Sequence, residues 1–498
     1  MTIDPRTPVL VGGGQVTAHD GGVEPVELLA RAAREAAAEA GTSRLLESVD
    51  SIRVVGLLSW RYRDPGALVA ERIGAHPRHT GYTGNGGSTP QVLVNGAAED
   101  IAAGRADVIL IGGAEAWRTR MKLRARGERP DWARQDDTVP SAPIIVPDVP
   151  MEAESERRIG LDRPSFVYPL FEQALRIGAG RSAAEHDKLL GELWSSFSEV
   201  AADNPHAWNR RRYAPAEITT PTDANRLISS PYPKLLNSNN MVDQGAALVM
   251  CSVETARRLG VPSSSWVFPH SGTESRDTDA IAARPALDGS APIRIGAARA
   301  LELAGIGIED IEHLDIYSCF PSAVQVAARE IGVPVNDPSR PLTCTGGLTF
   351  AGGPWNNYST HAIAAVATRL RGSPGAFGMV TANSGYLTKH AFGVYSTEPP
   401  AAGFRRRDVA ETVQEAWSGA EPPVEVIDSH EGAADLETWT VAYDRTGAPE
   451  RAFVAGRIRG GGRTLAVVTD RGDLDELATT EAQARRVRVA ADGSAHLD

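Results

Sequence analysis

The segment GYTGNGGSTPQ, residues 81–91, has the form of a loop that presents a nucleophile at the start of a helix. Apart from glycines it offers little more than hydroxyl and amide side chains. Ser88 would need a neighbouring base to act as a nucleophile. A serine on a turn before a helix is more typical of a helix cap, and we interpret Ser88 as one.

Other reactive groups stand far along the chain. The segment IYSCF contains Tyr317 and Cys319. A phenol can donate a hydrogen bond to a developing oxyanion or exchange a proton, although tyrosine is also a common filler at the end of a strand. Cys319 is flanked by apolar residues and is interpreted as a packing residue rather than a reactive thiolate. His361 and His390 are single histidines without a visible partner, which indicates structural roles unless they point into a pocket.

The surrounding elements follow a strand, helix, strand alternation. Residues 7–16 and 49–60 are short apolar runs typical of buried strands, and residues 24–41 between them have helical spacing and end in a glycine. The same order recurs in residues 90–104 and 106–117. This alternation predicts an α/β fold with a mainly parallel sheet.

The pattern occurs twice. Residues 293–320 can be laid on residues 26–57 with Gly305 on Gly41, and residues 356–385 on residues 88–115 with Gly372 on Gly104. Matched order of elements in both pairs indicates an internal duplication.

Two additions interrupt this duplicated pattern. An Arg-, Pro- and Trp-rich stretch reads as an insertion packed over the sheet. Five short alternating segments near the C-terminus, the first at residues 424–431, predict a small antiparallel β-barrel of the OB type. Because its aromatic residues are few and it is not strongly basic, we expect a structural or docking role rather than nucleic-acid binding. The expected divisions are a first half (1–116 and 234–262), the insertion (117–233), a second half (263–397), a linker (398–421) and the barrel domain (422–498).

Composition limits the function classes. The chain has 498 residues, a formal net charge of -12 and a pI near 5.5, which argues against wrapping nucleic acid. It contains no apolar run of about 18 residues and no basic-then-apolar leader, so we expect a cytoplasmic protein that does not enter a membrane. Three scattered cysteines predict no disulfide and no metal site.

Residues 1 to about 397 resemble the thiolase superfamily. The resemblance rests on the glycine-rich loop and helix followed by GRADVILIGGAEA, on the two tandem halves, and on IYSCF as a variant of a family motif. It implies a thiolase fold of two duplicated βαβαβαββ halves. Thiolases attack a thioester with a cysteine thiolate, aided by a histidine and a second cysteine. The family's spacing puts these three residues at Gly87, Gly353 and Asn383, so we expect no standard thiolase reaction.

With its added barrel, the chain is most similar to bacterial thiolase-like proteins of type 1, which are commonly labelled acetyl-CoA acetyltransferases and are thought not to carry out that reaction. The resemblance implies a role in lipid metabolism and a coenzyme A thioester as substrate or ligand, with no permanently bound cofactor. Tyr317, Cys319 and Asn383 are the candidate site residues. Three alternatives stay open: an aldolase-like C–C lyase that uses Tyr317, a non-catalytic CoA-binding protein, and a protein that docks a partner through its barrel. A homodimer and a monomer are both compatible with the resemblance.

Overall fold

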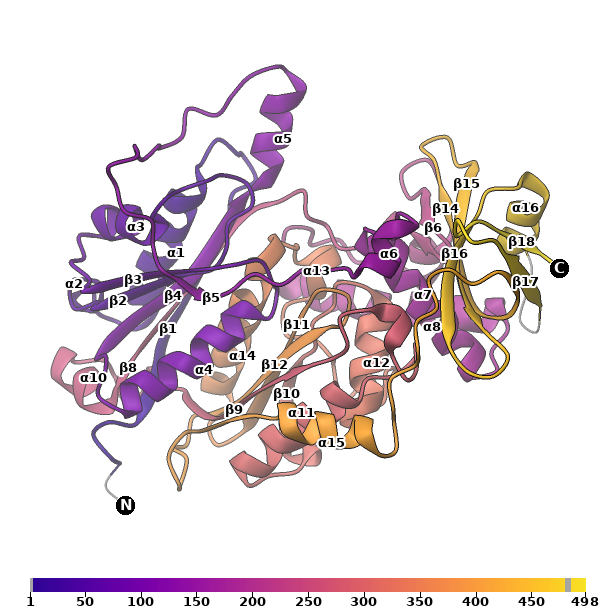
Figure 1. The fold of residues 1–498 in the computed structure, drawn as a ribbon. Helices are drawn as coiled ribbons and strands as arrows, with labels where there is room; N and C mark the ends of the chain where they lie inside the picture. The colour runs from indigo at the N-terminus through magenta and orange to yellow at the C-terminus, as the bar shows by residue number, and fades with distance from the viewer. Residues whose placement is uncertain (1–2, 480–484) are drawn as a thin grey trace.

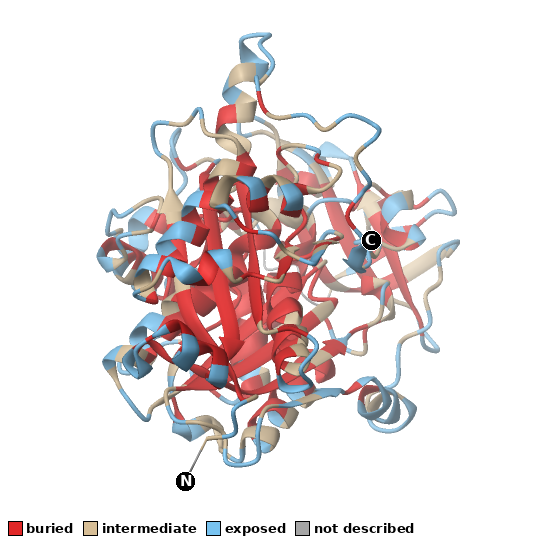
Figure 2. Cartoon of the chain, turned by 90° about the vertical axis from the view of Figure 1, so that its left-hand side faces the viewer, coloured by how far each residue is buried: buried red, intermediate tan, exposed pale blue. Residues whose placement is uncertain are grey.

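The computed structural model describes residues 3–479 and 485–498. Two mixed sheets lie side by side with helices between and around them, and a third, antiparallel sheet stands at one end of the molecule (Figure 1). Figure 2 shows that the buried residues concentrate in the strands and the helices between them, whereas the loops around them are exposed. None of the helices among the described residues is long and apolar enough to cross a membrane.

The first sheet has six strands in the order β1–β8–β4–β2–β3–β5. β4, β2, β3 and β5 run parallel, and β8 is antiparallel to both β1 and β4. Every residue of β4 and β8 is buried, as expected for apolar strands covered on both faces. The bounds are β1 (Pro8–Thr17), β2 (Ser51–Val54), β3 (His79–Thr83), β4 (Val108–Ala116), β5 (Ile144–Val146) and β8 (Asp243–Ser252).

The second sheet has the order β10–β11–β12–β9–β13. Read from β9, the run β9–β12–β11–β10 repeats β1–β8–β4–β2 of the first sheet, including the antiparallel pairs on both sides of the second strand. The predicted duplicated α/β fold is therefore confirmed. The bounds are β9 (Phe268–Arg276), β10 (Ile311–Asp315), β11 (Phe377–Ser384), β12 (Lys389–Ser396) and β13 (Arg405–Asp408).

Matching helices accompany the two sheets. α1 (Pro25–Glu39) packs on the first sheet and α11 (Ala291–Ala304) on the second, while α4 (Thr89–Ala102) and α14 (Tyr358–Gly372) contact strands of both. Gly41, just after α1, and Gly305, which ends α11, adopt φ values of +78° and +75°, a conformation that favours glycine. The other helices of the two halves are α2 (Arg44–Glu47), α3 (Pro65–Ile73), α10 (Val253–Leu259), α12 (Pro321–Ile331) and α13 (Gly347–Phe350).

The insertion was expected to pack over the sheet, but it also contributes strands to two of the sheets. Its strand β5 extends the first sheet, and its strands β6 (Leu227–Ser229) and β7 (Tyr232–Pro233) join the third sheet. Its long helices α7 (Pro164–Gly178) and α8 (Ala183–Asp203) bury apolar faces in the main core. Its remaining helices are α5 (Trp117–Ala125), α6 (Glu154–Arg158) and α9 (Pro215–Thr219).

The expected linker, residues 398–421, also contributes structure, because β13 pairs in parallel with β9 and α15 (Ala410–Ser418) follows it. The C-terminal sheet is antiparallel along β16–β15–β14–β17–β18, as predicted. The prediction of a strand at residues 424–431 is wrong, because Val426 forms only an isolated bridge there. The helix α16 (Arg471–Thr479) was not predicted. Closure into an OB-type barrel stays a prediction. The bounds are β14 (Gly432–Tyr443), β15 (Pro449–Arg457), β16 (Arg463–Val468), α16 (Arg471–Thr479), β17 (Arg486–Val489) and β18 (Ala495–Leu497).

Arg463 fastens the C-terminal domain to the rest of the chain. Its guanidinium is fully buried, pairs with Glu437, and donates hydrogen bonds to the carbonyl oxygens of Ala282 at 2.8 Å and Arg284 at 2.6 Å. Because a buried cation needs such partners, this contact ties the C-terminal sheet to one fixed position on the second half.

Candidate functional site

A cavity of about 750 Å³ lies where loops of the two halves and the insertion meet. Of the five positions that the thiolase resemblance singles out, four contribute to its wall. The fifth, Gly353, lies just outside, although its neighbours Trp355 and Asn356 line the cavity. The four are Gly87, Tyr317, Cys319 and Asn383.

Gly87 stands at the turn before α4, at the position that the resemblance assigns to a nucleophile. A Cβ atom built on Gly87 would lie 2.6 Å from the carbonyl oxygen of Asn383 and 2.7 Å from Cζ of Tyr317, and closer still to the Tyr317 hydroxyl. Real Cβ contacts are essentially never shorter than 3.0 Å. The Tyr317 phenol therefore fills the space that a side chain at position 87 would need.

Tyr317 follows β10 and is 8% exposed. Its backbone N–H donates to Oγ1 of Thr381 at 3.1 Å, and its ring packs edge-on against Tyr358 at 5.3 Å. Burial, with a smaller contribution from Cys319, raises the pKa of the phenol above its usual value. The hydroxyl consequently stays protonated and has no hydrogen-bond partner among the described residues, so it is an available donor at the cavity wall.

The side chain of Asn383 contacts Tyr168, a residue that the sequence analysis did not identify. Its Nδ2 donates to the hydroxyl of Tyr168 at 2.9 Å and lies 3.8 Å from the Cys319 sulfur. Tyr168 comes from α7 of the insertion, lines the cavity, and stacks on Phe320 with ring centroids 4.5 Å apart. No spacing along the chain links α7 to the second half, so only tertiary packing reveals this contact.

Cys319 carries a neutral thiol. It is 8% exposed, and burial raises its pKa to about 12, partly offset by hydrogen bonds from its neighbours. Since the thiolate is the nucleophilic form, this environment does not favour attack by Cys319 at neutral pH.

Ser88 does not use its side chain as predicted. It occupies the residue before α4, but its hydroxyl makes no cap bond to the helix. Instead its Oγ lies 2.7 Å from Oγ of Ser384, and its N–H donates to that same oxygen at 2.8 Å. The interpretation of Ser88 as a side-chain cap is therefore wrong, because the hydroxyl joins the glycine-rich loop to the end of β11.

The two candidate histidines lie outside the wall of the large cavity. Burial lowers the pKa of each to about 3, so both are neutral at pH 7. The Nδ1 of His361 lies 2.9 Å from Oε1 of Gln15, and Nε2 of His390 lies 3.1 Å from the carbonyl oxygen of Leu387. His390 instead borders a much smaller cavity of about 10 Å³, which Tyr317 and Asn383 also line.

The backbone of Gly353 is held by the loop that contains Asn239 and Asn240. Its N–H donates to the carbonyl oxygen of Asn239 at 2.9 Å, and a Cβ atom there would lie 2.9 Å from Oδ1 of Asn240. Asn356, three residues on, accepts from the N–H of Gly86 and donates to the carbonyl oxygen of Gly56, each at 2.9 Å. The Asn356 side chain therefore holds the glycine-rich loop in place, three residues after the position where the resemblance expects a histidine.

Few charges face the large cavity. The ionisable wall residues besides the phenols and the thiol are Asp148, Glu152 and Lys389. Burial lowers the pKa of Lys389, while Asp148 opposes that shift. Such a wall suits an uncharged ligand segment better than a polyanion.

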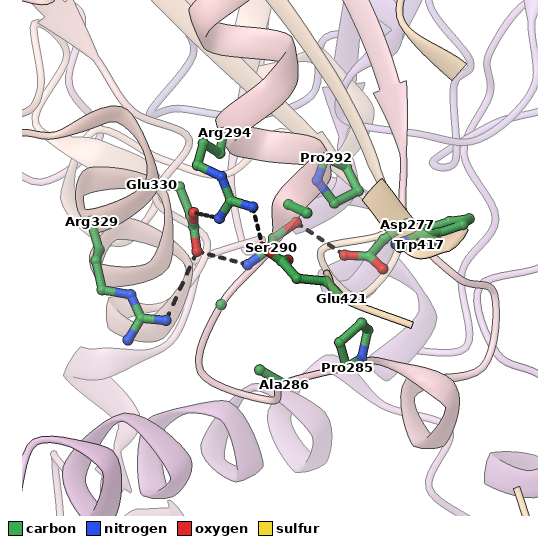
Figure 3. A pocket seen from close by; sticks show the side chains of 12 residues that line it. Asp277, Pro285, Ala286, Ser290, Pro292, Arg294, Arg329, Glu330, Trp417 and Glu421 are labelled. Atoms are coloured by element: carbon green, nitrogen blue, oxygen red, sulfur yellow. Dashed lines mark hydrogen bonds and ion pairs between the residues drawn. The ribbon is translucent and has the colours of Figure 1, made fainter. Parts of the chain in front are cut away.

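A second cavity, of about 190 Å³, lies at the start of α11 (Figure 3). Its charged groups satisfy one another: Arg294 pairs with both Glu330 and Glu421, and Ser290 donates to Glu330 through its N–H and to Asp277 through its hydroxyl. None of the candidate residues lines it. The charged side chains of this cavity therefore pair with one another, and the cavity is not the predicted site.

Comparisons with known proteins identify the family. Residues 412–494 match the family described as the thiolase-like protein type 1 additional C-terminal domain. An acetyl-CoA acetyltransferase of Methanocaldococcus jannaschii is 22% identical over 268 residues, which are 53% of this chain and only 60% of that protein.

Two solved structures extend the comparison. The Ltp2-ChsH2(DUF35) aldolase shares the fold with a TM-score of 0.59 at 20% identity, covering 78% of this chain and 98% of that one. A monomeric SCP2-thiolase like protein type 1 from Mycobacterium smegmatis is 32% identical, covers 100% of both chains and has a TM-score of 0.85. The chain accordingly belongs to the SCP2-thiolase like proteins of type 1 in the thiolase superfamily, related to acetyl-CoA acetyltransferases.

Proposed function

We propose that the protein binds an acyl-CoA thioester non-covalently in the 750 Å³ cavity, with the Tyr317 hydroxyl donating a hydrogen bond to the thioester carbonyl oxygen. The observation that carries this proposal is the placement of the phenol in the space where a side chain at position 87 would stand. A donor in that place meets the carbonyl that a nucleophile would otherwise attack.

The electrostatics of the wall support a donor role. The raised pKa of Tyr317 keeps its proton in place, and the raised pKa of Cys319 keeps that residue a thiol. With glycine at position 87, the cavity holds no activated nucleophile on the side of the carbonyl. An acyl-enzyme is therefore not part of the proposed function, whereas stabilisation of negative charge on the carbonyl oxygen is.

The size and polarity of the cavity also support this ligand. Pockets of about 300–1,000 Å³ hold drug-sized ligands. A wall with three charged residues fits the acyl group and the neutral pantetheine arm, while the nucleotide phosphates would stay in solvent outside it. We place the protein in acyl-CoA metabolism in the cytoplasm, acting as a monomer.

The test is calorimetric titration with butyryl-CoA, followed by isotope-edited infrared spectroscopy of the bound ligand labelled with ¹³C at its carbonyl. We expect saturable binding, and a carbonyl stretch shifted to lower frequency than in free butyryl-CoA. In Tyr317→Phe the shift is lost while binding remains. No heat-stabilisation or binding by any CoA thioester would sink the proposal, and a covalent acyl adduct in intact-protein mass spectrometry would contradict its non-covalent form.

A further inference from the structure

Lys389 supplies the positive charge in the wall of the 750 Å³ cavity. Its side chain is partly exposed, and no described residue forms an ion pair or a hydrogen bond with its ammonium group. Burial lowers the pKa of this lysine, because a partly desolvated cation is less stable than one in water. The ammonium group is therefore open to a ligand in the cavity, and a bound anion would offset the cost of its burial.

The charged groups around Lys389 already have partners. Asp148 also lines the cavity, and its carboxylate accepts hydrogen bonds from Nδ2 of Asn85 at 3.1 Å and from the following backbone N–H at 2.9 Å. Arg276, which stands opposite Lys389 in the neighbouring strand β9, forms an ion pair with Asp279. In the described part of the chain, Lys389 is thus the member of this group whose charge is left for a ligand.

The strand ladder places Lys389 beside the glycine-rich loop. Lys389 begins β12 and stands directly opposite Ser384 at the end of β11, so the two side chains share one face of the sheet. Both residues line the cavity. Oγ of Ser384 accepts from the N–H of Ser88 at 2.8 Å, which fixes this row of the sheet against the loop.

The same row lies close to the Tyr317 hydroxyl. Oγ of Ser384 is within 3 Å of the Cβ position on Gly86, and the Tyr317 hydroxyl is within 3 Å of the Cβ position on the next residue, Gly87. One residue step and one strand spacing therefore separate the phenol from the main chain of Lys389, a distance on the order of 10 Å. A short acyl chain and the four-carbon stem of the lysine together cover such a distance.

The turn that leads into Lys389 has a fixed and strained conformation. Leu387 is buried and has a φ of +57°, which is rare for a bulky residue. Its N–H donates to the hydroxyl of Tyr168 at 3.3 Å, and its carbonyl oxygen lies 3.1 Å from Nε2 of His390. Strain of this kind persists where the surrounding structure holds it, and it is concentrated at binding sites. The main chain of Lys389 is therefore held in one position at the cavity.

We propose that the acyl-CoA thioesters bound here carry a carboxylate at the far end of a short acyl chain, and that Lys389 binds this carboxylate while Tyr317 binds the thioester carbonyl. This inference rests on the proposed function. A saturated acyl chain leaves the ammonium group unpaired, whereas a carboxylate gives it a charge-assisted hydrogen bond. One lysine close to the carboxylate of Asp148 suits a single negative charge better than the phosphate groups of coenzyme A.

The first measurement compares glutaryl-CoA with valeryl-CoA, which has the same number of acyl carbon atoms and no carboxylate, by calorimetric titration of the intact protein. We expect glutaryl-CoA to bind about tenfold more tightly, as one charge-assisted hydrogen bond predicts. Equal or weaker binding of glutaryl-CoA would overturn the inference and leave the proposed function standing. If glutaryl-CoA, valeryl-CoA and butyryl-CoA all fail to bind, the proposed function is refuted together with this inference.

A lysine variant assigns the preference to its residue. In Lys389→Met we expect the preference for glutaryl-CoA to fall to less than about threefold, with unchanged affinity for valeryl-CoA. The matched control is Lys122→Met, which removes the same charge from an exposed position on α5 outside the cavity wall and should keep the preference. A preference retained in Lys389→Met would contradict the assignment. Equal weakening of both compounds would show that Lys389 binds a phosphate of coenzyme A, and would overturn it as well.

Discussion

Replacing Gly87 by alanine tests whether Tyr317 occupies the space beside it. The added methyl group would meet three atoms closer than 3.0 Å, one of which is the Asn383 backbone oxygen, which cannot rotate away. Overpacking of this kind costs about 1–3 kcal/mol, and we expect the upper end, about 3 kcal/mol, because a backbone atom must move. The φ of Gly87 is not in the left-handed region, so the loss would not come from backbone strain.

The assay is urea unfolding followed by tryptophan fluorescence. The matched control is Gly372→Ala, at the exposed end of α14, where a Cβ atom would meet nothing within 4 Å. There we expect no loss, or a gain of up to about 1 kcal/mol from a stiffer unfolded chain.

A double-mutant cycle then assigns the cause. Gly87→Ala in a Tyr317→Phe background loses the closest clash, with the hydroxyl, but keeps those with Cζ and the Asn383 oxygen. We expect recovery of about 1 kcal/mol, a coupling typical of residues in contact. If the free energy of unfolding of Gly87→Ala lies within about 0.5 kcal/mol of the wild-type value, which is the usual effect of a neutral surface change, then Tyr317 does not fill the space beside Gly87.

Three further outcomes are expected. Cys319, with a pKa of about 12, should resist iodoacetamide at pH 8 in the folded protein and react once urea unfolds it; rapid labelling of the native thiol would show a thiolate. Arg463→Met should destabilise the protein by about 3 kcal/mol because two buried carbonyl oxygens lose their donor and Glu437 keeps only Arg457 as its partner, whereas Arg459→Met, on the surface, should change stability by less than about 0.5 kcal/mol. Burial holds the pKa of His361 and His390 at about 3, below the unfolded value of 6.5, so the unfolded chain binds protons that the folded chain excludes: stability is full above pH 6.5 and falls on acidification, by about 2 kcal/mol per histidine at pH 5. The urea midpoint of the wild type should therefore fall between pH 7 and pH 5, and the fall should be smaller in His361→Gln and in His390→Gln; an equal fall in the wild type and both variants would contradict this.

The duplicated fold could be predicted because local signals repeat in it. Gly41 and Gly305 stop equivalent helices, and buried apolar runs mark the strands that follow. The edge strands β5 and β13 could not be predicted from the sequence. β5 is three residues long in a proline-rich stretch, and β13 reads RRRD, so neither has the period of a buried strand. Each forms because a neighbouring strand offers an open edge, which is a property of the assembled sheet.

The candidate site was predictable in position but not in chemistry. Spacing from a known family placed Gly87, Tyr317 and Asn383, and the structure brings them to one wall. Spacing could not show that the phenol fills the volume next to Gly87, nor that Tyr168 arrives from the insertion to orient Asn383. Both depend on packing between segments that are distant in sequence. Ser88 was misread for the same reason, since its partner Ser384 lies in the other half.

Helix α7 contacts both the cavity and the C-terminal domain. It carries Tyr168 into the cavity, while Phe166 packs against Phe453 of β15 at 5.1 Å and the carbonyl oxygen of Leu170 accepts from Thr438 of β14 at 2.6 Å. A ligand that needs Tyr168 in place also favours the docked C-terminal domain, and by linkage the docked domain raises the affinity for that ligand by the same factor. We therefore expect ligand occupancy to slow amide hydrogen exchange in β14, a strand that does not line the cavity.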